Sequence, residues 1–181
     1  MTERLDNLIL VDVLDAPIGT AEKREAHAAP LLHRAFSVFL TDGTGRLLLQ
    51  KRAAGKYHSG GLWANACCSH PRLGEQTIPS AEARLGEELG ITCPLREVGG
   101  FVYLHRFAEK LYEYEYDHVL LGRYAGNFAP DPQEIEALRW VTPAELSAEL
   151  RQSPERFAPW LITAAPMVLQ QPEFLDEKGR M

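Results

Sequence analysis

The sequence is poor in cysteine and has no long apolar run. Its 181 residues include only three cysteines, Cys67, Cys68 and Cys93, an odd number without the spacing of a disulfide framework. We therefore expect free thiols in a reducing compartment, the cytoplasm. No apolar stretch reaches the roughly 20 residues of a membrane helix, and residues 1–4 lack the basic start and apolar segment of a secretory signal. The expectation is a cytoplasmic protein outside any membrane.

Positive charge is also scarce. The 19 Lys and Arg residues are outnumbered by 25 Asp and Glu residues, which leaves a formal net charge of -6. This balance argues against a nucleic-acid partner, because nucleic-acid binding needs a basic face. Basic residues gathered at one place are then expected to serve a small anion. With 45% apolar and 24% charged residues, the composition is that of one globular domain spanning residues 1–181. A monomer is expected, with a homodimer as the alternative.

Apolar runs and turn residues predict an α+β domain with a mixed sheet. Strands are expected at residues 8–14, 35–41, 46–52, 63–69, 98–104 and 112–124. Helices are expected at residues 80–89, 143–150 and 159–170. Gly90 should end the first helix, Thr142 should open the second through a capping box with Glu145, and Pro166 should interrupt the third. Residues 16–19 and 55–61 are expected to be loops, and the tail from Pro172 is expected to be frayed.

Residues 74–91 resemble the Nudix box, a loop–helix–loop that holds a divalent metal against a diphosphate. Its end, Glu87-Glu88-Leu89-Gly90-Ile91, matches well, whereas Ala83-Arg84 stands where the box has Arg-Glu. The change removes a carboxylate that a hydrolase uses to collect Mg²⁺. It also places Arg84 one helical turn before Glu88 on the same face. A solvated helix with an Arg–Glu ion pair is the competing interpretation.

Residues 63–71 bring a thiol and an imidazole together. If the segment is extended, Cys68 and His70 point to the same side, because side chains alternate along a strand. A thiol beside a metal ligand suits proton transfer in a site that carries cations. Burial of Cys67 and Cys68 in the core is the competing interpretation, since free cysteine is among the most buried residue types.

The third motif is Tyr112-Glu113-Tyr114-Glu115-Tyr116. On a strand, Glu113 and Glu115 share one face, about 7 Å apart along the chain, and the tyrosines share the other. Two carboxylates so close repel each other unless something neutralises them, and a metal ion would do so. The competing interpretation is a half-exposed strand whose acidic residues lie in water.

Together these motifs identify the chain as similar to the type I isopentenyl diphosphate isomerases, a family with the Nudix fold. The resemblance runs from about residue 8 to residue 160 and includes Asn65, Cys68, His70 and Pro71 of the second motif. It implies a Nudix-like mixed β-sheet core flanked by helices, with N-terminal extension strands and C-terminal helices. It also implies an isomerase of isoprenoid biosynthesis that interconverts isopentenyl diphosphate and dimethylallyl diphosphate. A proton would be added at C4 and another removed from C2, through a tertiary carbocation.

The resemblance further implies the roles of the reacting groups. Glu115, assisted by Tyr103, would protonate the alkene, and Cys68 would take the C2 proton. The roles exchange in the reverse direction, and the assignment of acid and base to each direction is left open. Trp160 would lay an aromatic face over the cation and exclude water, with ordinary core packing as its alternative role.

A metal site follows from the same resemblance. It would take Mn²⁺ or Zn²⁺, with Fe²⁺ as a further choice, in a near-octahedral arrangement. Its five ligands would be His27, His33, His70, Glu113 and Glu115. The interval from His27 to His33 is one residue shorter than the family pattern, so the position of His27 depends most on local geometry.

A second metal, Mg²⁺, would enter with the substrate diphosphate. Glu88 would help to hold it, together with the backbone carbonyl of Cys68. The diphosphate itself would be bound by four basic side chains, those of Lys23, Arg52, Lys56 and Arg84. An acidic protein can thus bind an anion, because charge-assisted contacts and the metal gather at one place.

Two other functions are compatible with a Nudix-like helix. One is a Nudix hydrolase that cleaves a nucleoside diphosphate derivative, and the other is a module that binds metal or ligand without catalysis. Ala83-Arg84 and Cys68 disfavour the hydrolase, because hydrolysis uses the lost carboxylate and needs no thiol. The presence of Cys68, Tyr103 and Glu115 together disfavours a module without catalysis.

Overall fold

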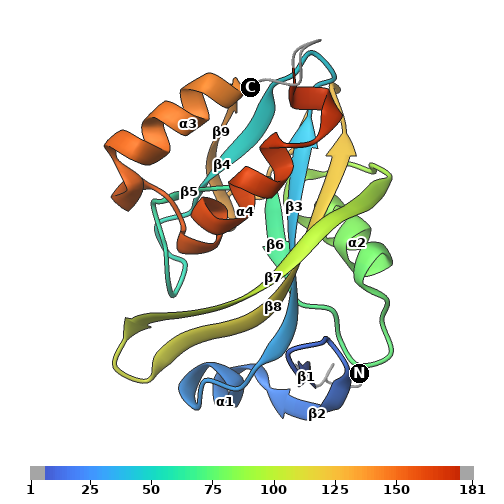
Figure 1. Ribbon diagram of the computed structural model, residues 1–181, viewed down its shortest axis with the longest axis vertical. Helices are drawn as coiled ribbons and strands as arrows, with labels where there is room; N and C mark the ends of the chain where they lie inside the picture. The colour runs from blue at the N-terminus through green and yellow to red at the C-terminus, as the bar shows by residue number, and fades with distance from the viewer. Residues whose placement is uncertain (1–6, 176–181) are drawn as a thin grey trace.

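The sheet of this protein is built around strand β3 (His33–Thr41). In the computed structural model, which describes residues 7–175, β3 pairs with four other strands. It runs parallel to β8 (Leu111–Arg123) and antiparallel to β1 (Asn7–Val11), β4 (Leu47–Arg52) and β6 (Cys67–Ser69). The nine-stranded mixed sheet (Figure 1) is completed by β2 (Pro17–Glu22), β5 (Trp63–Ala64), β7 (Leu95–Ala108) and β9 (Ile135–Val141).

Alternating apolar residues give the middle of the sheet two buried faces. Phe39 of β3 and Leu49 of β4 pack in one cluster with residues of α3 (Pro143–Gln152) and α4 (Pro159–Leu169). Val38 and Leu48, one position earlier on each strand, belong to a second cluster with residues of α2 (Thr77–Leu89). Helices therefore cover both faces of the sheet, which holds β3 between two cores.

The N-terminal residues extend the sheet and carry α1 (Lys23–Ala28) to the edge of the site. β1 and β2 form an antiparallel hairpin, and Leu10 of β1 pairs with His33 of β3. Next to the hairpin turn, Nε of Arg34 donates to the Asp15 carboxylate at 2.7 Å. The hairpin and α1, blue in Figure 1, bury a small cluster of their own, made of Leu8, Ala21 and Ala26.

Three elements were missed by the sequence pattern, namely β2, α1 and β9. Residues 17–19 lie in β2 and not in a loop, because an edge strand accepts a proline as its first residue. Only Ala21 of β2 is buried, so this strand lacks the apolar alternation by which strands are predicted. The predicted strand at residues 8–14 ends at Val11, because the Asp12 carboxylate accepts hydrogen bonds from the backbone N–H groups of Leu14 and Ala16 and forms a turn.

The predicted helices are present with different limits. α2 begins at Thr77 and ends where Gly90 adopts a left-handed conformation with φ of 66°. The capping box of Thr142 and Glu145 is confirmed. Pro166 does not interrupt α4, because six buried side chains hold the helix in the core as far as Leu169.

The predicted strand at residues 63–69 is divided into β5 and β6, because the side-chain amide of Asn65 between them donates to the backbone carbonyls of Val38 and Cys67. The other differences concern the long hairpin and the C-terminal end. β7 is longer than predicted, whereas β8 has the predicted length and begins one residue earlier, and the two strands form a hairpin that reaches beyond the core of the sheet (Figure 1). Short 3-10 turns occur at Pro154–Arg156 and Pro172–Phe174, and Phe174 is buried, so the first residues of the predicted frayed tail are packed. Residues 176–181 lie outside the described range. No helix within residues 7–175 has both the length and the apolar character to cross a membrane.

Candidate functional site

Strand β3 brings together the two halves of the site. On one side of it His33 lies opposite Glu115 of β8, and on the other side Ser37 lies opposite Cys68 of β6. Cys68 and Glu115 therefore stand on separate strands that flank β3, and both line the same cavity. The predicted face-sharing of Glu113 and Glu115 is confirmed, since both are buried while the tyrosines between and beside them are half-buried.

Two buried histidines have ring nitrogens without a hydrogen-bond partner. Nδ1 of His27 lies 2.7 Å from the carbonyl oxygen of Lys23, and Nδ1 of His33 lies 2.7 Å from that of Leu31. A carbonyl only accepts a hydrogen bond, so Nδ1 carries the proton and Nε2 keeps a free lone pair. Both Nε2 atoms are buried and make no hydrogen bond. A buried neutral imidazole with a free lone pair on Nε2 can bind a metal ion through that atom.

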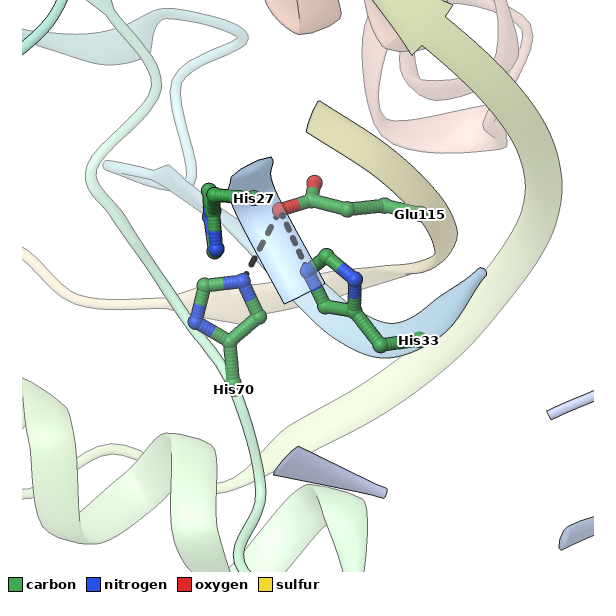
Figure 2. A group of neighbouring side chains, drawn as sticks. All are labelled: His27, His33, His70 and Glu115. Atoms are coloured by element: carbon green, nitrogen blue, oxygen red, sulfur yellow. Dashed lines mark hydrogen bonds and ion pairs between the residues drawn. The ribbon is translucent and has the colours of Figure 1, made fainter. Parts of the chain in front are cut away.

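Four ligand atoms converge at this place, as Figure 2 shows. His27, His33, His70 and Glu115 each offer one atom, and these atoms all lie within 4.8 Å of one another. Oε1 of Glu115 lies 2.8 Å from Nε2 of His70 and 3.6 Å from Nε2 of His33. The residues come from α1, β3, the segment after β6 and β8, so only the folded chain assembles them. Three imidazoles and a carboxylate fit a mid-series divalent ion.

Burial keeps these groups in the form that binds a metal ion. Burial and the neighbouring His33 lower the pKa of His27 to about 4. Burial also lowers the pKa of His70 to about 4, against the opposing effect of Glu115. For Glu115, burial acts to raise the pKa, but the contacts with His33 and His70 hold the pKa well below its usual range. At neutral pH, His27 and His70 are thus uncharged and Glu115 is ionised, as metal binding requires.

Glu113 lies beside the group of four rather than in it. Its carboxylate accepts a hydrogen bond from the Tyr103 hydroxyl and lies 3.0 Å from Nε2 of His58. The hydrogen bond of the Tyr103 hydroxyl is thus made with Glu113, the neighbour of Glu115 on the same face of β8. Tyr103 is directly opposite Glu115 in the β7–β8 register, but its long side chain reaches the diagonal neighbour. His58 was missed because it lies in the predicted loop, where no periodicity indicates where a side chain points.

The Cys68 thiol is buried next to a guanidinium group. Nη1 of Arg52 lies 3.6 Å from Sγ of Cys68. Burial raises the pKa of the Cys68 thiol to about 12, although Arg52 acts in the opposite direction. The thiol is therefore protonated at neutral pH. Cys67 points away into the core and is fully buried, so core packing holds for Cys67, whereas Cys68 lines the cavity.

Trp160 lies between the core and the cavity. It packs with Ala64 and Ala158, and it also lines the cavity that contains Cys68. The indole Nε1 donates to Oδ1 of Asn65 at 2.9 Å, and the Arg52 guanidinium lies 5.2 Å from the ring centroid. The Trp160 ring is thus held in a fixed orientation at the wall of the site.

A network of cations and carboxylates occupies the Nudix-like helix and the loops beside it. Nε of Arg84 donates to Glu88 at 2.7 Å, Nη1 to Glu87 at 2.8 Å and Nη2 to Glu134 at 2.9 Å. Lys56 also forms an ion pair with Glu134. The predicted pairing of Arg84 with Glu88 is confirmed, but Glu88 is buried, and this burial raises its pKa in spite of Arg84. The helix is therefore part of the site and not a solvated surface element.

The other basic residues divide between the cavity and the surface. Lys23, from α1, lines the cavity, and burial and the neighbouring Lys56 lower its pKa. Lys51 instead pairs with Glu136 at 2.7 Å in a partly exposed ion pair. Trp63 packs against the core cluster that includes α4, with the Arg139 guanidinium 4.3 Å from its ring centroid.

Comparison with known proteins gives consistent matches over most of the chain. The NUDIX domain profile matches residues 31–161. A protein of Burkholderia multivorans named isopentenyl-diphosphate Delta-isomerase is 50% identical over 155 residues, which cover 86% of this chain and 88% of that protein. A protein of Photorhabdus laumondii named isopentenyl-diphosphate Delta-isomerase 2 is 48% identical over 153 residues, which cover 84% of this chain and 86% of that protein.

Solved structures share the fold at lower identity. The structure of DR0079 from Deinococcus radiodurans has a TM-score of 0.72 at 20% identity, and the match covers 88% of this chain and 97% of that one. A MutT NUDIX hydrolase from Burkholderia pseudomallei has a TM-score of 0.59 at 22% identity, with coverage of 76% and 98%. At such identities these structures establish the architecture and leave the reaction to other evidence.

Proposed function

The chain belongs to the Nudix family and, within it, to the isopentenyl-diphosphate Delta-isomerases, and on this premise we propose how its residues carry out the reaction. It is an isomerase that interconverts isopentenyl diphosphate and dimethylallyl diphosphate. One observation carries the proposal: Cys68 and Glu115 line one cavity from strands on either side of β3. Hydrolysis lacks equal support, because the likeness to a Nudix hydrolase at 22% identity concerns the fold.

Cys68 and Glu115 are the proposed proton donor and acceptor. The reaction adds a proton at C4 and removes one from C2, which needs an acid and a base on opposite faces of a flat alkene. The pair has one transferable proton, because Cys68 is a thiol and Glu115 is ionised. In this state Cys68 donates and Glu115 accepts. In the state with the proton on Glu115 the roles are exchanged, and Tyr103 acts on Glu115 through its neighbour Glu113.

The histidine group is proposed to bind Mn²⁺ or Zn²⁺. His27, His33 and His70 supply nitrogen ligands, Glu115 supplies an oxygen ligand, and Glu113 next to them is the fifth. The unpartnered Nε2 atoms of His27 and His33 support this assignment, because buried polar atoms are otherwise hydrogen-bonded. A bound divalent ion stabilises the ionised carboxylate and so alters its acidity. The histidines also orient Glu115 toward the cavity.

The diphosphate end of the substrate is proposed to lie among Lys23, Arg52, Lys56 and Arg84, all of which line the cavity. Glu88 and the carbonyl of Cys68 are the proposed ligands of the Mg²⁺ that accompanies the diphosphate. Binding energy from this remote end holds the alkene in register with the reacting groups. The ring of Trp160 then covers the cationic carbon and keeps water away from it.

The proposed setting is isoprenoid biosynthesis in a reducing compartment such as the cytoplasm. Its support is the chemistry of the site, since Cys68 must remain a thiol to exchange protons, and all three cysteines of this chain are free. The proposed substrate is a small isoprenoid diphosphate, bound by one chain without a contribution from a second copy.

Isomerisation in heavy water tests the proposed function directly. Dimethylallyl diphosphate formed from isopentenyl diphosphate should carry deuterium, and removal of divalent ions with a chelator should stop its formation. Phosphate release from a panel of nucleoside diphosphate derivatives serves as the control for hydrolysis. Turnover of that panel, with no deuterium in the isoprenoid product, would overturn the proposal.

A further inference from the structure

Glu134 is a carboxylate of the cavity to which the proposed reaction gives no role. It directly precedes β9, and its backbone is fixed on both sides. Its N–H donates to the carbonyl of Asp131 at 3.0 Å, and its carbonyl accepts from the N–H of Ala53 at 2.9 Å. The side chain is therefore held against Lys56 and Arg84, two of the proposed diphosphate ligands, and it pairs with both.

The charges that line the cavity cancel formally. Its four cations, Lys23, Arg52, Lys56 and Arg84, face four carboxylates, Glu88, Glu113, Glu115 and Glu134. A metal-free diphosphate is a strongly charged anion, and the side chains there offer it no excess of positive charge beyond that of an ion bound by the histidine group. To contact Lys56 and Arg84 it must also replace the carboxylate of Glu134, which repels it. The repulsion grows in proportion to the charge of the ligand.

Glu134 is not required to orient Arg84. Arg84 is already fixed by Glu88 at 2.7 Å and by Glu87 at 2.8 Å, through nitrogens other than the one that contacts Glu134. Glu134 is also partly exposed, with 22% of its side chain accessible, so a ligand can reach it. Its effect on the site is therefore electrostatic more than structural.

We propose that Glu134 makes the cavity selective for the magnesium complex of the diphosphate over the metal-free diphosphate. The inference rests on the diphosphate site of the proposed function. Mg²⁺ offsets two of the phosphate charges, so the complex suffers less repulsion from Glu134 than the free anion does. The carboxylate of Glu134 among the cations thus weakens the binding of a ligand more strongly when the ligand carries more negative charge.

Calorimetric binding of inorganic diphosphate, with and without excess Mg²⁺, tests this role in the full chain. Glu134→Gln keeps the shape and one hydrogen-bond acceptor but removes the charge. It should bind metal-free diphosphate about tenfold more tightly, which corresponds to about 1.4 kcal/mol, and its affinity for the magnesium complex should change less than about twofold. Glu134→Asp keeps the charge and should keep the preference of the wild type.

Glu136→Gln is the matched control, because Glu136 lies on β9 two residues after Glu134 and pairs with Lys51 outside the cavity. It should leave both affinities unchanged. If Glu134→Gln binds both ligands more weakly, or with an unchanged ratio, Glu134 is a supporting residue and the inference is wrong. If the wild type binds neither ligand, the proposed diphosphate site itself is wrong, and the inference about Glu134 is wrong with it. This result is distinct from the two outcomes described for Glu134→Gln.

Discussion

Oε1 of Glu115 lies 2.8 Å from Nε2 of His70, although the two residues approach from opposite sides of strand β3. Glu115 is placed by the parallel pairing of β8 with β3, and His70 follows β6, which pairs with β3 in the antiparallel sense. A slip of either pairing by one residue would turn the side chains to the other face of the sheet. The site therefore depends on the register of both pairings.

Removal of either proton-transferring group should abolish isomerisation. Cys68→Ala and Glu115→Gln each delete one partner of the pair, and general acid–base catalysis contributes about 10²- to 10⁴-fold. We expect losses of that size in kcat, measured together with deuterium incorporation. Cys67→Ala is the matched control, because Cys67 faces the core. It should remain active, and an exchange rate in Cys68→Ala equal to that of the wild type would contradict the assignment.

Loss of a ligand should reduce the metal content of the chain. His33→Ala removes one of the two unpartnered Nε2 atoms, and we expect less than one bound divalent ion per chain by elemental analysis. Metal should also stabilise the wild type, by about 4 kcal/mol at a thousandfold excess over Kd, and this gain should be lost in the variant. His105, on β7 and outside the group of four, provides the control His105→Ala. Equal metal content in His33→Ala and wild type would refute the site.

The stability of the metal-free chain should fall as the pH is lowered from about 6.5 to 4. The folded chain holds the pKa of His27 and of His70 at about 4, whereas an unfolded histidine has a pKa of about 6.5. Between these values the unfolded chain binds more protons, so acid favours unfolding. Each histidine should contribute a slope of about 1 kcal/mol per pH unit. Urea denaturation at several pH values measures it.

A double variant isolates the contribution of the two histidines to this dependence. In His27→Asn with His70→Asn the ligand groups can no longer take up protons. The free energy of unfolding should then change less steeply between pH 6.5 and 4 than in the wild type. Identical slopes would mean that these imidazoles are not held uncharged in the folded chain.

The ring of Trp160 should protect the cationic carbon from water. Trp160→Phe keeps an aromatic face but loses the hydrogen bond to Asn65, and it should still form mainly the isomerised product. Trp160→Leu has no aromatic face, and we expect part of the substrate to leave as a tertiary alcohol diphosphate. Product analysis by mass spectrometry distinguishes the two. Absence of the alcohol in Trp160→Leu would assign Trp160 to packing alone.

Strands with a buried face and helices with caps could be predicted from the sequence. Two signals are local in the sequence, namely the apolar alternation of β3 and β4 and the capping box of Thr142. The folded chain contains the buried strand faces and the helix cap that these signals predict. Edge elements could not be predicted in this way. β2 is exposed along most of its length and α1 has six residues, so neither has a periodic apolar face.

The residues of the site were predicted better than their contacts. Cys68, His70 and Glu115 line one cavity, whereas the hydrogen bond of Tyr103 to Glu113 could not be read from the sequence, because a diagonal contact depends on the twist of the β7–β8 hairpin. His58 and Glu134 were not predicted. Both belong to irregular segments, where the direction of a side chain is set by tertiary packing and not by a repeat in the sequence.

The small cluster of Leu8, Ala21 and Ala26 is separate from the two large cores, and it has a kinetic consequence. The cluster holds β1, β2 and α1 together as one unit. Because this unit has so few buried apolar groups, its local opening costs less free energy than the unfolding of the whole chain. Because Lys23 and His27 belong to this unit, its opening withdraws a cation and a metal ligand while the rest of the sheet stays folded. We expect ion exchange to follow the rate of this opening, which amide hydrogen exchange over residues 7–28 would report.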